Sequence, residues 1–236
     1  MSAYPRGDLL VEPAWLAERL GQPDVVVIDC DPAELRDARE HIPGALHLPI
    51  HQYFRDAATF KHVAPPEEAE SVLRGLGVNN DSTVVLYDQR GSINAARTWW
   101  VLWYYGFEHA VVLNGGWPAW QAEGYAGATD WAVATRPGNF TARVVPERYA
   151  SCATILPRLG QPDFVPLDVR DDLEWSGTKP APNANNQREG RIPGAVHIEW
   201  VEFVDWENAT RFKPAEWIDA RLVGAGITRD KRVVPY

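Results

Sequence analysis

The loop after the apolar run Thr83–Tyr87 lies beyond the carboxyl end of a predicted strand, where a site is expected in an α/β sheet. It reads Asp88-Gln89-Arg90-Gly91 and leads into a helix expected over residues 94–105. Backbone N–H groups that converge at the start of a helix form a cradle for anions, and a cysteine in such a cradle is readily deprotonated and nucleophilic. Asp88 is instead a carboxylate. We expect it to cap the helix, because Asp is a preferred capping residue; the alternative is that its carboxylate fills the cradle.

Neither cysteine of the chain is placed to act as such a nucleophile. Cys30 directly follows a predicted strand that Asp29 closes, and Cys152 lies in a predicted helix. We expect both to be small buried side chains that behave as hydrophobic residues. Two cysteines at unrelated positions form no disulfide framework, which is typical of a reducing cytoplasm. His47 and His197 each begin a strand, and structural roles are favoured for both.

A long internal repeat organises the elements that position this loop. Three pairs of segments define it: Leu20–Asp24 with Leu159–Asp163, Ile42–Ala45 with Ile192–Ala195, and Gly77–Tyr87 with Gly226–Tyr236. A repeat of this length, with one α/β unit per copy, indicates tandem domains, which we place at residues 1–146 and 147–236. The second copy ends at Tyr236, one residue before the position of Asp88 in the first copy.

Strands are predicted to alternate with helices in both copies. The expected strands are Val25–Ile28, Thr83–Tyr87, Ala110–Leu113, Phe164–Asp168 and Arg232–Tyr236; the expected helices are Pro13–Leu20, Pro66–Leu76, Asn94–Tyr105, Pro118–Glu123, one near Tyr149, and Pro214–Val223. This order favours two doubly wound α/β domains with parallel sheets, the second incomplete. Ligands bind beyond the carboxyl ends of the strands in such sheets. A Gly-, Pro- and Asn-rich insertion between Asp168 and Ile192 is predicted to be an exposed loop.

Composition and charge narrow the class of protein. The 236 residues are 45% hydrophobic and 23% charged, with a net charge of −9, as in ordinary globular proteins. The basic residues are scattered, which argues against a nucleic-acid partner, and no apolar run approaches the ~18 residues of a membrane span. No spacing typical of a metal site and no glycine-rich phosphate loop is present. We therefore expect a cytoplasmic protein without metal, cofactor or membrane partner.

The chain resembles the tandem-domain rhodanese family, the thiosulfate and 3-mercaptopyruvate sulfurtransferases. These segments carry the resemblance in the first copy: Val27–Asp29, His41–Ala45, Val84–Asp88 leading to Ala96-Arg97, and Val112–Gly116 with Trp120. In the second copy they are Asp168–Arg170, Trp175–Gly177, Ile192–Ala195 and Val233–Tyr236. Each segment alone is weak evidence for the family, but the occurrence of all of them in order in both copies is specific to it. The resemblance implies two rhodanese-like domains, the first non-catalytic and the second catalytic.

In that family a nucleophilic cysteine directly follows a strand like Val233–Tyr236. Its thiolate takes the outer sulfur of thiosulfate, releases sulfite and holds the sulfur as a persulfide until a thiophilic acceptor removes it. The resemblance thus places the cysteine just after Tyr236, so the chain contains no catalytic residue and is expected to be inactive as given. Asp88 stands at the equivalent position of the first copy and cannot form a persulfide. The predicted partners are a small-molecule sulfur donor and an acceptor.

Arg170 is the candidate substrate-binding residue. It aligns with Asp31, so only the second copy has a cation there, and the resemblance places it beside the catalytic loop, where a guanidinium can grip sulfonate or carboxylate oxygens. The alternative is a salt bridge to Asp168, Asp171 or Glu174. Family members often carry a second arginine near the position of Glu174, and its absence weakens the mercaptopyruvate interpretation.

Other functions fit the same segments. The chain could be a non-catalytic rhodanese-like binding or scaffold module, or a 3-mercaptopyruvate sulfurtransferase. A phosphatase of rhodanese-like fold would carry a longer loop for phosphate, and Tyr236, rather than histidine before that loop, argues against it.

Overall fold

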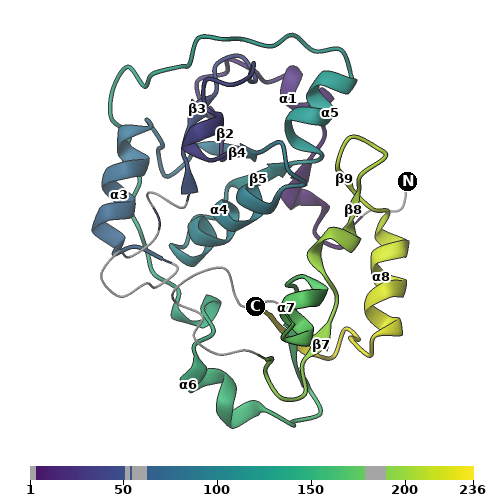
Figure 1. Ribbon diagram of the computed structural model, residues 1–236. Coiled ribbons are helices and arrows are strands. Elements are labelled where there is room, and N and C mark those ends of the chain that lie inside the picture. Colours follow the sequence, from purple (N-terminus) through teal and green to yellow (C-terminus); the bar gives the residue numbers. More distant parts are fainter. Residues whose placement is uncertain (1–3, 51–53, 55–62, 179–189) are drawn as a thin grey trace. The chain divides into compact units, whose positions relative to one another are not determined.

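A computed structural model describes residues 4–50, 54, 63–178 and 190–236 (Figure 1). By their internal contacts, the described residues divide into two compact units. The N-terminal unit comprises residues 4–148 together with 205–212, and the C-terminal unit comprises residues 149–204 and 213–236. The chain is an α/β protein with parallel sheets, as predicted. The boundary between residues 146 and 147, and the assignment of catalytic type to each domain, stay predictions.

The N-terminal unit is built on a five-stranded parallel sheet. Its strands, in spatial order, are β1 (Leu10–Val11), β5 (Ala110–Leu113), β4 (Thr83–Tyr87), β2 (Val25–Asp29) and β3 (Leu46–His47). The central strands β2 and β4 are continuous apolar runs because helices cover both faces of the sheet. The predicted strands are confirmed in this unit.

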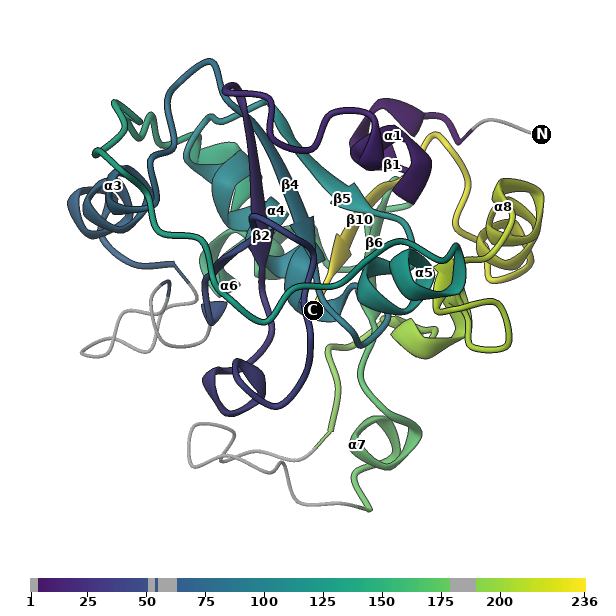
Figure 2. The same cartoon turned by 90° about the horizontal axis from the view of Figure 1, so that it is seen from above.

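Two pairs of helices enclose this sheet (Figure 2). Helices α3 (Pro66–Gly75) and α4 (Ile93–Tyr104) pack on one face, and α1 (Pro13–Ala17) and α5 (Gly116–Ala122) pack on the other. The helix predicted over residues 13–20 is shorter in the structure, where α1 ends at Ala17. Helix α4 is the longest in the described part of the chain, with 12 residues, and none of the described helices could cross a bilayer.

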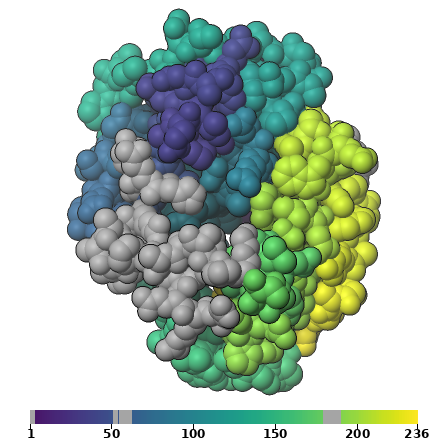
Figure 3. Space-filling model, in the orientation of Figure 1, coloured from purple at the N-terminus to yellow at the C-terminus, as the bar shows by residue number. Residues whose placement is uncertain are grey.

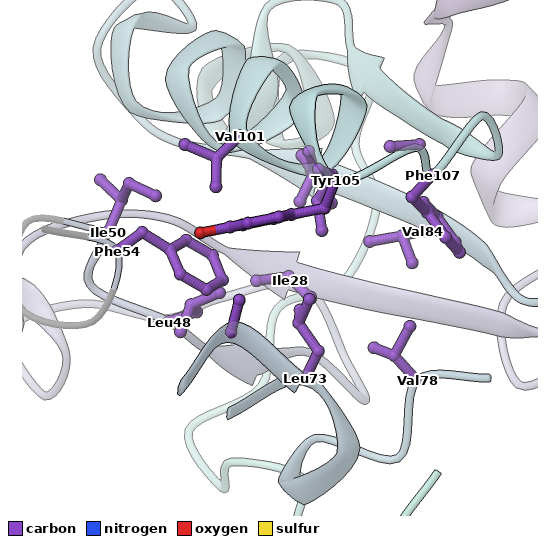
Figure 4. Packing of buried hydrophobic residues seen from close by; sticks show 14 of the residues in the cluster. Ile28, Leu48, Ile50, Phe54, Leu73, Val78, Val84, Val101, Tyr105 and Phe107 are labelled. Carbon is purple, nitrogen blue, oxygen red and sulfur yellow. The ribbon is translucent and has the colours of Figure 1, made fainter. Parts of the chain in front are cut away.

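The larger core lies between the sheet and the helices α3 and α4 (Figure 4). The ring of Tyr105 lies among the side chains of Val101, Ile28 and Leu73. Its hydroxyl donates a hydrogen bond of 2.5 Å to the carbonyl oxygen of Ala64. A buried hydroxyl without a partner would be destabilising, so this bond allows a polar residue inside the apolar layer.

The C-terminal unit has a three-stranded parallel sheet in the order β10 (Arg232–Pro235), β6 (Phe164–Asp168) and β7 (Val196–His197). Its helices are α6 (Cys152–Ile155), α7 (Asp172–Ser176) and α8 (Ala215–Gly224). The pairing repeats that of the first unit: Asp29 is opposite His47 and Tyr87, and Asp168 is opposite His197. The sequence repeat therefore has the same strand register in both sheets.

Short elements complete the described chain. They are the 3₁₀ helices η1 (Gly7–Leu9), η2 (Ala33–Leu35), η3 (Pro146–Arg148), η4 (Leu156–Arg158) and η5 (Trp200–Phe203), and the strands β8 (Val204–Asp205) and β9 (Arg211–Phe212).

Two prolines lie inside strands of the C-terminal unit. The residues after Pro166 bond to β10: the N–H of Tyr236 donates to the oxygen of Leu167, and the N–H of Val169 donates to the oxygen of Tyr236. Hydrogen bonds alternate between the two sides of a strand, so the nitrogen of Pro166 faces the side where β7 pairs only with later residues. Pro235 likewise faces away from β6. Neither proline removes a ladder hydrogen bond.

Two expectations need correction in this unit. The insertion after Asp168 begins with the helix α7, which Asp171 caps by accepting a 2.8 Å hydrogen bond from the N–H of Glu174, and which ends at Gly177 with φ of 74°. The rest of the predicted loop, residues 179–189, lies outside the described residues. Cys152 is exposed at the first turn of α6, not buried. No residue of this short helix is buried, so its first residue lies at the surface with the others.

Candidate functional site

The loop after β4 forms an anion cradle that Asp88 occupies with its own carboxylate. One oxygen accepts hydrogen bonds from the N–H groups of Arg90 at 2.8 Å and Ser92 at 2.9 Å. The other accepts from Asn94 at 2.8 Å and Ala95 at 3.0 Å. Ser92 is the capping residue of α4 by position, with φ of 66°, but its side chain makes no cap bond. Asp88 therefore caps the helix and fills the cradle at once.

This carboxylate is deeply enclosed. Asp88 is buried, and burial raises its pKa, while the four N–H groups of the cradle act in the opposite direction. Its carbonyl oxygen accepts a 3.0 Å hydrogen bond from the N–H of Trp117. A Cβ atom on Gly116 would lie 2.0 Å from the same oxygen, so glycine is required there. The loop is thus fixed from the helix side and from the α5 side.

A second buried acidic group lies beside the first, at the carboxyl end of β2. Nη2 of Arg39 donates to Asp29 at 2.7 Å and to Asp31 at 2.5 Å. The N–H of Gln89 also approaches Asp31, at 3.2 Å. Burial, together with the charge of Asp29, raises the pKa of Asp31 to about 6 against the opposing effect of Arg39. The edge of this sheet therefore gathers more acid than base.

The equivalent edge of the C-terminal unit has the opposite arrangement. Arg170 binds Asp168 with both branches of its guanidinium, Nε to Oδ1 at 2.9 Å and Nη2 to Oδ2 at 2.5 Å. Nη2 also donates to the carbonyl oxygen of Gly190 at 3.0 Å. Burial raises the pKa of Asp168, but the hydrogen bonds from Arg170 outweigh it and leave the pKa below its ordinary value. Within the described residues, Nη1 of Arg170 makes no hydrogen bond. The Arg170 side chain is 22% exposed.

Equivalent side chains support both edges. Nε2 of His47 lies 2.9 Å from the carbonyl oxygen of Asp31, and Nε2 of His197 lies 2.9 Å from that of Arg170. The hydroxyl of Tyr87 accepts a hydrogen bond from the N–H of Ile42, and the hydroxyl of Tyr236 accepts one from the N–H of Ile192. The two histidines thus hold the loop after the first strand, in agreement with the structural role predicted for them.

Sequence reasoning missed the aromatic stacks at these edges. Trp131 stacks on His41, with ring centroids 3.8 Å apart, in the N-terminal unit. In the C-terminal unit, Trp175 stacks on His197 at 4.8 Å with an angle of 7° between the rings, and Cζ of Arg191 lies 4.2 Å from the centroid of Trp175. Arg39 was also missed. Arg39, Trp131 and Arg191 come from irregular segments, where periodicity gives no signal.

The thiols lie away from these edges or inside the fold. Cys30 is fully buried, as predicted, and burial raises the pKa of its thiol well above the ordinary value. Cys152 belongs to α6, which precedes the amino end of β6. In the described part of the chain, His, Cys, Asp and Glu side chains form no group of three that could hold a metal ion.

Comparison with known proteins agrees with this geometry. Residues 12–123 match the Rhodanese-like domain family. The thiosulfate sulfurtransferase of Pseudomonas aeruginosa is 33% identical over 245 residues, covering 100% of this chain and 84% of the relative. The 3-mercaptopyruvate sulfurtransferase of Escherichia coli K12 is 29% identical over 230 residues, covering 93% of this chain and 80% of the relative.

A solved structure extends the likeness to three dimensions. The crystal structure of SseA, a 3-mercaptopyruvate sulfotransferase from Escherichia coli, superposes with a TM-score of 0.81 at 27% identity, covering 96% of this chain and 87% of that one. The repeated strand register, the loop after β4 and these likenesses agree. The chain belongs to the rhodanese family of sulfurtransferases.

Proposed function

We propose that this protein moves sulfane sulfur from thiosulfate to a thiophilic acceptor through a cysteine persulfide in the C-terminal unit. In the first step a thiolate attacks the outer sulfur of thiosulfate, and the bond between the two sulfur atoms of the donor breaks. Sulfite leaves with the electron pair of that bond. In the second step an acceptor such as cyanide attacks the terminal sulfur of the persulfide, forming thiocyanate and restoring the thiolate.

The arrangement around Tyr236 carries this proposal. Tyr236 contacts the neighbouring loop as Tyr87 does, so a residue that follows it would take the place of Asp88 at a strand end. A cysteine there, in a cradle of backbone N–H groups, would be a thiolate at neutral pH. The cation of Arg170 at the same edge would attract an anionic donor.

The N-terminal unit is not the proposed place of the reaction. Its cradle is filled by Asp88, which makes four hydrogen bonds to backbone N–H groups. A carboxylate has no sulfur to form a persulfide. Cys30, the nearby thiol, is fully buried and its pKa is raised, so it is neither accessible nor ionised.

Thiosulfate is proposed as the donor in preference to 3-mercaptopyruvate. Family members often have a second arginine near the position of Glu174, and this chain has no arginine there, so the carboxylate of mercaptopyruvate would lose that partner. The second candidate donor stays relevant because the Escherichia coli relative carries its name.

Steady-state kinetics with both donors tests the proposal. The protein expressed from its complete reading frame should form thiocyanate from thiosulfate and cyanide with parallel double-reciprocal lines, as expected for a covalent intermediate. The 236-residue chain is the matched control and should form none above the uncatalysed rate. Sulfur transfer from 3-mercaptopyruvate but not from thiosulfate would make 3-mercaptopyruvate the donor. Absence of sulfur transfer from both compounds would favour a non-catalytic scaffold.

A further inference from the structure

We infer that Arg191 is a second anion-binding residue of the C-terminal unit, and that it selects a doubly charged sulfur donor over a singly charged one. The inference rests on the proposed function, because it names the donor recognised at the same strand edge. The sequence places Arg191 in the exposed loop predicted between Asp168 and Ile192. The structure instead stacks its guanidinium on the ring of Trp175.

Stacking holds the guanidinium of Arg191. Its Cζ lies 4.2 Å from the centroid of the Trp175 ring, and Nη1 donates a 3.4 Å hydrogen bond to the carbonyl oxygen of Trp175. The opposite neighbour of this ring is His197, whose Nε2 lies 2.9 Å from the carbonyl oxygen of Arg170. Arg191, Trp175 and His197 thus form a stack that reaches the backbone of Arg170. The residues of α7 lie at the surface of the molecule (Figure 3).

The backbone on both sides of Arg191 is anchored to the same edge. The carbonyl oxygen of Gly190 accepts a hydrogen bond from Nη2 of Arg170 at 3.0 Å. The N–H of Ile192 donates to the hydroxyl of Tyr236 at 3.0 Å. Cζ of Arg170 in turn lies 5.5 Å from the centroid of the Tyr236 ring. A cation on the residue between these two anchors is therefore close to the end of β10.

The other unit shows that this cation is not needed to build the edge. There the stack consists of Trp131 with His41 and His47, at centroid distances of 3.8 and 5.1 Å. His41 occupies the position of Arg191 in the repeat and is fully buried. The guanidinium over the Trp131 ring, with its Cζ 5.7 Å from the centroid, belongs to Arg36 and not to the aligned position. The ring stack of this unit therefore forms without an arginine at the position of Arg191.

The charges of the two edges differ in the same direction at both aligned positions. Position 31 is an acid where position 170 is an arginine, and position 41 is a histidine where position 191 is an arginine. The first edge holds Asp29, Asp31 and Asp88 with one cation, Arg39. The second holds Arg170 and Arg191 with the buried carboxylate of Asp168 and the exposed carboxylate of Asp172, whose Oδ1 lies 3.6 Å from Nδ1 of His197. Two guanidinium groups match the charge and the several oxygens of a dianion such as thiosulfate better than they match one carboxylate.

Arg191 can accept such a ligand because little of its hydrogen-bonding capacity is used. Within the described residues its guanidinium makes one hydrogen bond, the long one to Trp175, and the residue is exposed. An arginine that stacks on an aromatic ring keeps the N–H groups of its rim for a further partner. Stacking also reduces the freedom lost on binding, which favours affinity.

Calorimetric titration of the 236-residue chain tests this inference without needing catalysis. The probes are thiosulfate and 3-mercaptopyruvate, and the variants are Arg191→Ala, Arg191→Lys and Arg229→Ala. Arg229 is the matched control, because it is an exposed arginine of the same unit paired with Asp219 at 2.9 Å. We expect Arg191→Ala to weaken thiosulfate binding about tenfold and mercaptopyruvate binding less than about threefold, and Arg191→Lys to restore part of the loss.

The results that overturn the inference are distinct from failure of the proposed function. Equal weakening for both probes, the same Kd in Arg191→Ala as in the unmodified chain, or no thiosulfate binding by the unmodified chain would each contradict it. Thermal unfolding of each variant separates loss of binding from loss of fold, and Arg229→Ala should match the unmodified chain. Failure of the proposed function would appear elsewhere, as absence of sulfur transfer by the protein from its complete reading frame.

Discussion

Arg170 grips both carboxylate oxygens of Asp168 from a position only two residues further along the chain. The equivalent carboxylate, Asp29, is instead held by Arg39, ten residues away. A buried carboxylate at the end of the first strand thus needs a cation in either unit, but the two units supply it from different positions. Where the loop supplies the cation, position 31 is free to be an acid. Where position 170 supplies it, the cation also faces the strand edge.

Replacing Arg170 should reduce both stability and sulfur transfer. In Arg170→Ala the carboxylate of Asp168 is buried without its partner, and we expect the unfolding free energy of the C-terminal unit to fall by about 3–5 kcal/mol. In the protein from its complete reading frame, kcat/KM for thiosulfate should fall by the equivalent of about 2–5 kcal/mol. Urea unfolding and initial rates give the two values.

A double variant separates these two effects of Arg170. Asp168→Asn combined with Arg170→Gln removes both charges and should recover most of the stability, because no ion is left unpaired. It should not recover the use of thiosulfate. Recovery of both together would mean that Arg170 acts only through its bond with Asp168.

The stability of the N-terminal unit should depend on pH through Asp31. Its folded-state pKa of about 6 is above the ordinary value, so the folded state binds the proton more tightly. The protonated side chain of Asp31 therefore stabilises the folded state below about pH 4, and this contribution is lost as the pH rises through 6. Asp31→Asn should therefore be stabilising relative to the unmodified chain at pH 8, by up to about 3 kcal/mol, and much less so at pH 4.

Chemical unfolding at a series of pH values measures this difference. Asp130→Asn is the control, because Asp130 is an exposed aspartate of the same unit. A stability difference for Asp31→Asn that does not change between pH 4 and 8 would show that Arg39 fully compensates the burial of Asp31.

The cradle filled by Asp88 should accept an external anion once the carboxylate is removed. Asp88→Ala leaves four N–H groups without their acceptor, and we expect a loss of about 2–4 kcal/mol. Sulfate should then stabilise Asp88→Ala more than the unmodified chain, by mass action at the vacated cradle. Thermal unfolding in sulfate and in chloride of equal ionic strength measures it. Equal salt responses of the two proteins would indicate that the loop has collapsed.

Gly115 should tolerate no side chain. Its φ is +77°, and a Cβ would lie 2.6 Å from both the Cβ of Ala119 and the oxygen of Ala209. Gly124 is the matched control, with φ of +80° and open space around it. Gly124→Ala should cost about 1 kcal/mol from backbone strain, and Gly115→Ala should cost at least about 2 kcal/mol more. Similar values for the two, by urea unfolding, would mean that the hairpin bearing Ala209 moves aside.

Much of the fold could be predicted because buried parallel strands are continuous apolar runs. Ala110–Leu113 agrees with the structure at both ends, and the repeat fixed which strands correspond. Helix α7 was missed although its signals are present, an Asp cap with Glu three residues later and a terminal glycine, because the loop-forming composition of the following residues outweighed them.

The site was predicted less completely than the fold. Asp88 and Arg170 follow strands, where the repeat makes their positions comparable, so their types could be interpreted. Arg39 and Arg191 come from loops, and Trp131 comes from the segment between the two copies. Their contacts with the strand edge depend on how these loops fold back, which no periodic pattern in the sequence encodes.

The central claim is that a residue directly after Tyr236 carries sulfur in the second unit. The most direct measurement is mass spectrometry of the protein from its complete reading frame, incubated with thiosulfate and digested without reductant. The account predicts one added sulfur atom on a cysteine in the peptide that contains or follows Tyr236, lost again on adding cyanide, and none on Cys30 or Cys152. Sulfur on either of those cysteines, or on no peptide at all while thiocyanate is formed, would contradict it.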